Sequence, residues 1–238
     1  MHQITVSDIP IDVERKDIKN LHLAVYPPAG RVRIAAPLRV DDEAVRLFAI
    51  ERLSWIKKQQ ARFETQARQT ERELVSGESH YFQGQRYLLD VTYQDSPSGV
   101  AIRNKTHMEL SVRPGSGLER RKRVLNTWYR AQLKAQIPPL IEKWQAIAGI
   151  EVHDWGIKHM KTKWGTCNTE ARRIWLNLEL AKKPERFLEY IILHEMVHLL
   201  ERYHNDRFTA YMDQFMPQWR SVREELNRFV LSHEEWDY

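Results

Sequence analysis

The chain has 238 residues, 42% of them hydrophobic, which allows one large domain or two small ones around a sizeable core. A single cysteine excludes an internal disulfide. No stretch approaches the roughly twenty apolar residues needed to cross a bilayer, so we expect no membrane span. Acidic residues interrupt the N-terminal stretch too early for a signal peptide, and we therefore expect a cytoplasmic protein.

The net charge is +5, and basic residues are densest at 119–123 and 159–163. Such a balance is compatible with an anionic partner, including nucleic acid, without requiring one. A solvated helix face explains the first cluster without any partner. The charge pattern therefore leaves the partner open.

The first part of the chain predicts a β-hairpin and a long helix. Residues 21–26 and 31–37 alternate polar and apolar side chains around a Pro-Pro-Ala-Gly turn. Asp41 or Asp42 is a suitable cap for a polar helix that we expect to run to about Leu74.

A second group of β segments follows, and we expect these to form a small antiparallel module: 81–83, 87–93, 99–102 and 108–112. Pro-Gly-Ser-Gly at 114–117 combines the strongest local breakers. We therefore predict an N-terminal β-rich module with a long helix over residues 1–117, and a catalytic domain over residues 118–238.

The second half begins with a helical pattern over 118–148, which Pro138 and Pro139 are expected to bend or restart. Residues 151–180 return to strand-like sequence. They lead to Pro184, which suits the first turn of the next helix.

That next helix carries the motif H-E-x-x-H at His194, Glu195 and His198 within an apolar run. Residues four apart lie above one another on a helix, so the two imidazoles can bind one metal ion. Glu195 can act as the base toward a metal-bound water. Burying two histidines and a glutamate without partners would be costly, which favours a metal site over a packed core.

Catalytic zinc requires a third protein ligand, and His204 has the spacing of the extended motif, although Glu201 replaces its usual glycine. We expect the motif helix to end near 202–203 and Asn205 or Asp206 to cap a new helix. His204 would then lie at a corner that can face the metal. The alternative is a surface or capping histidine. The amphipathic run that follows is expected to pack beneath the site.

Two further segments precede the motif helix: Lys-Trp-Gly-Thr-Cys at 163–167 and Ile-Trp-Leu-Asn at 174–177. Together with H-E-M-V-H, the following histidine and Phe208, they resemble the YgjP-like family of predicted zinc-dependent metallohydrolases. The likeness is close in the C-terminal half and weaker before it. Thr166 stands where serine is more usual, which retains a hydroxyl.

This resemblance extends to SprT-like and WLM-type zincins and implies an α+β fold. Its catalytic domain would be zincin-like, with a mixed sheet and the H-E-x-x-H helix, preceded by the small antiparallel module and long helices. The implied Zn²⁺ ligands are His194, His198 and His204, with Glu195 as general base.

Other side chains of these segments have simpler interpretations. Cys167 could be a nucleophile or an extra ligand, but a packed thiol is the more usual role of a lone cysteine. We expect Trp164 and Trp175 to pack in the core or the cleft wall. Asn177 is a candidate cleft residue.

We therefore predict a zinc-dependent hydrolase, foremost a metallopeptidase acting on a peptide or protein. An extended substrate would lie along an edge strand near residues 174–178. A second stabiliser of the oxyanion stays open among four residues, Tyr203, Tyr211, His159 and Lys163.

Two alternatives remain. The same metal-activated water could attack a nucleoside triphosphate, although the acidic clusters usual in phosphoryl enzymes are missing near the motif. A nucleic-acid-associated module with a non-catalytic zinc is the other, although a structural zinc site favours four protein ligands and needs no base. The sequence leaves the oligomeric state open.

Overall fold

The structure, a computed structural model, describes residues 2–26, 30–65, 72–160 and 163–228, without the side chains of 62–65 and 228. The chain divides into two compact units between Glu71 and Arg72. The expected boundary lay instead at 114–117. That boundary stays a prediction, which the folding of separate fragments would test.

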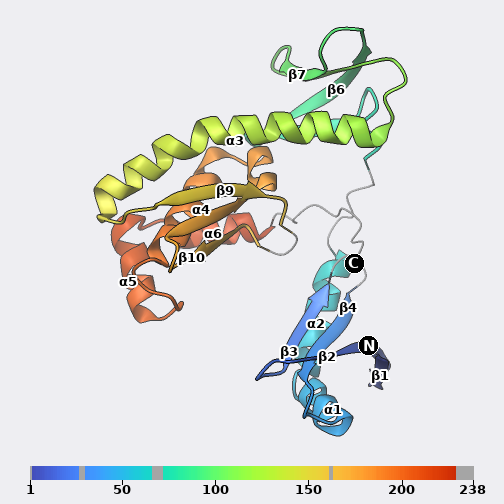
Figure 1. The fold of residues 1–238 in the computed structure, drawn as a ribbon, viewed down its shortest axis with the longest axis vertical. Coiled ribbons are helices and arrows are strands. Elements are labelled where there is room, and N and C mark those ends of the chain that lie inside the picture. The colour runs from blue at the N-terminus through green and yellow to red at the C-terminus, as the bar shows by residue number, and fades with distance from the viewer. Residues whose placement is uncertain (1, 27–29, 66–71, 161–162, 229–238) are drawn as a thin grey trace. The chain divides into compact units, whose positions relative to one another are not determined.

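The first unit contains a four-stranded sheet of order β1-β2-β4-β3 (Figure 1). Its strands are β1 (His2–Val6), β2 (Ile9–Lys16), β3 (His22–Tyr26) and β4 (Arg31–Pro37). The antiparallel pairing of β3 with β4 confirms the predicted hairpin strands, whereas its turn at 27–29 lies outside the described residues. Strand β2 pairs with β4 in parallel.

Two helices pack on this sheet, α1 (Asp42–Glu51) and α2 (Leu53–Thr65). The Asp41 side chain accepts a hydrogen bond from the Ala44 N–H, which confirms the predicted cap. The prediction of a single long helix was wrong. The helix is interrupted at Arg52, and Leu74 has a φ of 53°, which an α-helix does not allow.

The second unit begins with a sheet of order β5-β6-β8-β7. Its strands are β5 (Ser79–Phe82), β6 (Gln85–Tyr93), β7 (Gly99–Ile102) and β8 (His107–Val112). The prediction of an antiparallel module was wrong for one pair of strands. Strand β8 forms an antiparallel hairpin with β7, and its other edge pairs with β6 in parallel. Apolar residues of this sheet share one core with the helix that follows.

That helix, α3 (Leu118–Ala148), runs without interruption through Pro138 and Pro139. The prolines do not restart it, although each removes one backbone donor, and Figure 1 shows the helix curving toward its C-terminal end. A buried stripe at helical spacing holds it in place: Leu125, Tyr129, Leu133, Ile137, Ile141 and Trp144.

The last sheet has the order β10-β11-β9, with β9 (Asp154–Lys158), β10 (Gly165–Asn168) and β11 (Arg173–Asn177). β11 pairs with β9 in parallel and with β10 antiparallel, so β11 is central and β10 lies at an edge. The expectation that residues 174–178 form an edge strand was therefore wrong.

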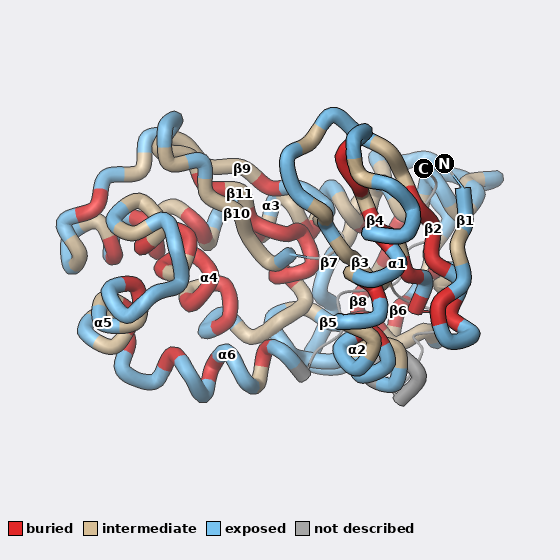
Figure 2. Tube along the Cα trace, turned by 90° about the horizontal axis from the view of Figure 1, so that it is seen from below, coloured by how far each residue is buried: buried red, intermediate tan, exposed pale blue. Residues whose placement is uncertain are grey.

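A short helix η1 (Leu178–Lys182) leads into α4 (Glu185–Val197), and α5 (Asp206–Phe215) and α6 (Trp219–Arg228) complete the unit. Pro184 is the N-cap of α4, one residue before the predicted first turn. Helix α4 is buried over most of its length (Figure 2), because it contacts β10, β11, α3, α5 and α6. No helix in the described part of the chain is long and apolar enough to cross a membrane.

Candidate metal centre

The motif lies at the C-terminal end of α4, which ends at Val197 with His198 as its C-cap. The predicted end near 202–203 was therefore too late. The chain tightens there, since the Leu199 and Leu200 N–H groups donate to the carbonyls three residues earlier. Asn205 caps α5 through a bond from the Phe208 N–H, as predicted.

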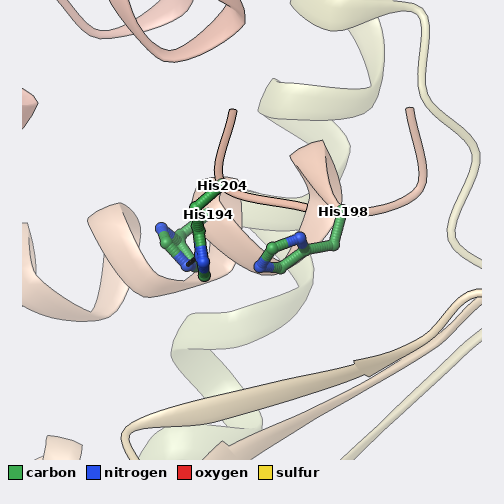
Figure 3. A group of neighbouring side chains, drawn as sticks. All are labelled: His194, His198 and His204. Carbon is green, nitrogen blue, oxygen red and sulfur yellow. Dashed lines mark hydrogen bonds between the residues drawn. The ribbon is translucent and has the colours of Figure 1, made fainter. Parts of the chain in front are cut away.

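These turns bring three imidazoles together, those of His194, His198 and His204 (Figure 3). One ring nitrogen from each lies within 4.8 Å of the others, and Nε2 of His194 lies 3.0 Å from Nε2 of His204. Phe208 on α5 contacts all three rings, with centroid distances of 4.7 to 4.9 Å. This contact confirms that α5 packs beneath the histidines.

The histidines have the chemistry of a metal site. Burial lowers the pKa of His194 to about 3, with the His198 and His204 charges acting in the same direction, so the ring is neutral near pH 7. His198 Nδ1 lies 3.2 Å from the Glu201 carbonyl oxygen. If Nδ1–H donates to that oxygen, the lone pair of Nε2 is available for a metal ion. Three imidazole nitrogens gathered within 4.8 Å suit tetrahedral zinc, whose ligand nitrogens are about 3.3 Å apart.

One buried ring nitrogen at this centre has no hydrogen-bond partner among the described residues. Nδ1 of His194 is buried and makes no hydrogen bond with any residue that the structure describes. Packing against Tyr190, 5.7 Å away between ring centroids, and against Phe208 therefore orients this ring. The two contacts replace the hydrogen bond that usually fixes a zinc-bound imidazole.

Glu195 lies beside the histidines and is only 5% exposed. Burial raises the pKa of its carboxyl group to about 8, although the charge of Lys163 opposes the shift. A carboxyl group with such a pKa can exchange a proton with water or an amine near neutral pH.

The histidines and Glu195 open into a cleft of about 720 Å³. One wall is the edge strand β10 with the residues before and after it, and the other is α4 with Arg202. The remaining lining residues are Lys163, Trp164, Gly165, Thr166, Cys167, Asn168, Thr169, Glu170, Tyr190 and Ile191.

Of the four proposed oxyanion stabilisers, the cleft contains only Lys163. Tyr203 is 67% exposed and does not line the cleft, and Tyr211 does not line it either. His159 lies 3.6 Å from the Glu179 carboxylate, outside the cleft. Helical spacing could have identified Tyr190, which stands four residues before His194.

Cys167 and the two tryptophans lie in different surroundings. Burial, together with the nearby Glu195 charge, raises the pKa of Cys167 to about 11, so its thiol stays protonated and is a poor nucleophile. Trp164 lines the cleft. Trp175 instead faces away from the core, between buried Ile174 and Leu176, with the Lys158 ammonium 3.6 Å from its ring centroid.

Asn177 is fully buried and does not line the cleft, so its expected role as a cleft residue was wrong. Its side-chain amide donates to the carbonyls of Met160 (2.7 Å) and Lys163 (2.8 Å), and its backbone N–H donates to the Trp164 carbonyl. Asn177 thus fastens the backbone that enters β10.

The solved structures that match this chain include two metallopeptidase zymogens of low similarity. Abylysin from Pyrococcus abyssi is 19% identical with a TM-score of 0.37, and the match covers 41% of this chain and 97% of that one. Jannalysin from Methanocaldococcus jannaschii is 21% identical with a TM-score of 0.34, and the match covers 38% and 92%. Likenesses of this size carry no argument about this chain. A comparison with curated proteins gives no match.

A family model gives the decisive match. The model described as "YgjP-like, metallopeptidase domain" matches residues 19–229, which is most of the chain and includes the whole cleft. A family of metallopeptidases implies a catalytic metal and a peptide or protein substrate. The chain therefore belongs to the YgjP-like family and is a metal-dependent hydrolase of the peptidase type.

Proposed function

We propose that the chain is a zinc metallopeptidase in which His194, His198 and His204 hold the metal and Glu195 is the general base. The convergence of three imidazole nitrogens within 4.8 Å in the lining of the cleft is the observation that carries this proposal. Imidazole donors suit zinc, and three protein ligands leave a position open for water. Zinc held in this way would supply a lowered pKa for its water and polarisation of the scissile carbonyl.

Glu195 would perform the proton transfers. Beside a bound metal dication the carboxyl group would ionise despite its burial. The carboxylate would then take a proton from the attacking water and return it to the amine of the leaving peptide. The buried position of Glu195 beside His194 suits this exchange, because little bulk water competes for the proton.

The substrate would pair with β10. This strand is the edge of its sheet and forms one wall of the cleft, so an extended peptide can bond to its backbone while facing the histidines. Lys163 and Arg202 also line the cleft, and either cation could stabilise negative charge that develops on the carbonyl oxygen.

The test compares wild type with Glu195→Gln, each loaded with zinc, on a fluorogenic peptide library and a panel of nucleoside triphosphates. We expect one zinc per chain in both proteins and peptide turnover reduced by about 10²- to 10⁴-fold in the variant. The matched control is Glu189→Gln on the same helix, whose carboxylate pairs with Lys143 at 2.5 Å outside the cleft.

The control should keep wild-type turnover. Peptide turnover that survives Glu195→Gln would contradict the proposed base. Turnover of nucleotides but not of peptides would contradict the proposed substrate class.

A further inference from the structure

Gly165 is the first residue of β10 and lies directly against Glu195. A Cβ atom at Gly165 would be 2.7 Å from Oε1 and 2.8 Å from Cγ of Glu195, and 2.9 Å from Cγ2 of Ile191. Carbon atoms do not approach neighbours so closely, so a side chain here would force one of them to move. The φ of Gly165 is not positive, so space rather than backbone conformation requires the glycine.

The backbone at Gly165 cannot easily retreat. Gly165 pairs with Leu176 in the β10–β11 ladder, and Asn177 binds the carbonyls of both preceding residues. On the other side, α4 is fixed by its contacts with β10, β11, α3 and α6. The Glu195 carboxylate is the end of a flexible side chain, so it is the group that moves at least cost.

We propose that Gly165 is a positioning residue, whose missing side chain leaves the space in which the Glu195 carboxylate lies between the edge strand and α4. The inference rests on the proposed role of Glu195 as base. In this role Gly165 acts through the position of the Glu195 carboxylate and does not itself contact the reacting atoms.

The test is Gly165→Ala, measured by turnover, zinc content and thermal unfolding. A displacement of about 1 Å can cost about 10² in rate, so we expect kcat to fall about 100-fold. KM and zinc content should stay within about 2-fold of wild type, since neither histidine ligands nor strand hydrogen bonds are removed.

A double-mutant cycle separates positioning from general damage. In the Glu195→Gln background the base is already absent, so Gly165→Ala should lower kcat by less than about 2-fold. A 100-fold loss in both backgrounds would overturn the proposal, as would wild-type kcat in Gly165→Ala. Survival of turnover in Glu195→Gln alone would instead refute the proposed function, so the two failures are distinguishable.

Gly156→Ala is the matched control within the same sheet. Its Cβ would be 2.3 Å from the Trp175 ring, and neither residue lines the cleft. We expect reduced stability with unchanged kcat.

If Gly165→Ala does not fold, the double variant with Gly165→Ala and Glu195→Asp provides the second measurement. Aspartate is shorter than glutamate by one methylene and leaves space for the alanine side chain, so the double variant should fold and bind zinc. A double variant that does not fold would overturn the proposal.

Discussion

Replacing Asn177 by alanine should destabilise the second unit and loosen the approach to the cleft. The Asn177 side chain is fully buried and makes four hydrogen bonds. Two join its amide to carbonyls, and two join its Oδ1 to the N–H groups of Glu179 (3.2 Å) and Met160 (3.4 Å). With about 1 kcal/mol for each good bond and less for the longest, Asn177→Ala should lower the free energy of unfolding by about 3 kcal/mol.

Urea and thermal unfolding followed by tryptophan fluorescence measure this loss. Six of the eight tryptophans lie within residues 72–232, so the signal reports mainly on the unit that contains Asn177. For a unit of this size, about 3 kcal/mol corresponds to a fall in Tm of roughly 6 to 12 °C.

Two further variants test whether the side-chain hydrogen bonds of Asn177 cause this loss. Asn177→Asp keeps the shape but replaces the donors with a buried charge, so it should destabilise at least as much as alanine. Asn168→Ala removes a single exposed bond to the Ala171 N–H and should cost less than about 1 kcal/mol. A loss below about 0.5 kcal/mol for Asn177→Ala, or an Asn177→Asp variant as stable as wild type, would refute the proposed role of Asn177 in holding the backbone before β10.

Three other predictions follow from the same unit. Phe208 is 2% exposed beneath the three imidazoles, so Phe208→Ala should lower the free energy of unfolding by about 3 to 5 kcal/mol and weaken zinc binding. Phe208→Leu should keep most of the stability and most of the zinc affinity. Urea unfolding measures the stability, and competition for zinc with a chelating dye measures the affinity. An alanine variant with unchanged zinc affinity would contradict the supporting role. Burial opposes ionisation of Glu179, but Lys182 and His159 outweigh it and lower the pKa of that carboxyl below its ordinary 4.5. Its stabilising contribution is thus present above pH 4.5 and is lost as pH falls further. Glu179→Gln should therefore be less stable than wild type at pH 7 and approach it in acid, whereas a constant difference between urea midpoints from pH 3 to 8 would speak against the ion pairs. Removal of zinc by a chelator should lower Tm, and zinc at 100 times its Kd should restore about 2.7 kcal/mol. His198→Ala should show no such response in differential scanning calorimetry, and a zinc-dependent Tm in that variant would exclude His198 as a required ligand.

Local features of the fold were predictable because a few neighbouring residues determine them. Asp41 and Asn205 cap helices through bonds to N–H groups three residues ahead, and both are side chains that favour this position. The spacing of His194 and His198 likewise predicts their shared helix face, and the structure adds His204 to the same group. The roles of these histidines stay proposals.

Features that depend on distant contacts were not predictable. The parallel partner β9 makes β11 central, and no pattern within 174–178 reports the presence of that neighbour. The α4 helix ends early because its last turn tightens around His198, which its helical sequence does not indicate. The contacts of Asn177 and Gly165 arise only when β10, β11 and α4 come together.

The location of bound zinc tests the central claim most directly. Crystals of the zinc-loaded protein would be measured on both sides of the zinc absorption edge, and the anomalous difference map would locate the ion. We predict one peak at about 2.0 to 2.1 Å from a ring nitrogen of each of His194, His198 and His204, with Glu195 beside it and outside bonding distance. A peak elsewhere, or one that lacks His204 as a ligand, would contradict the proposed metal centre.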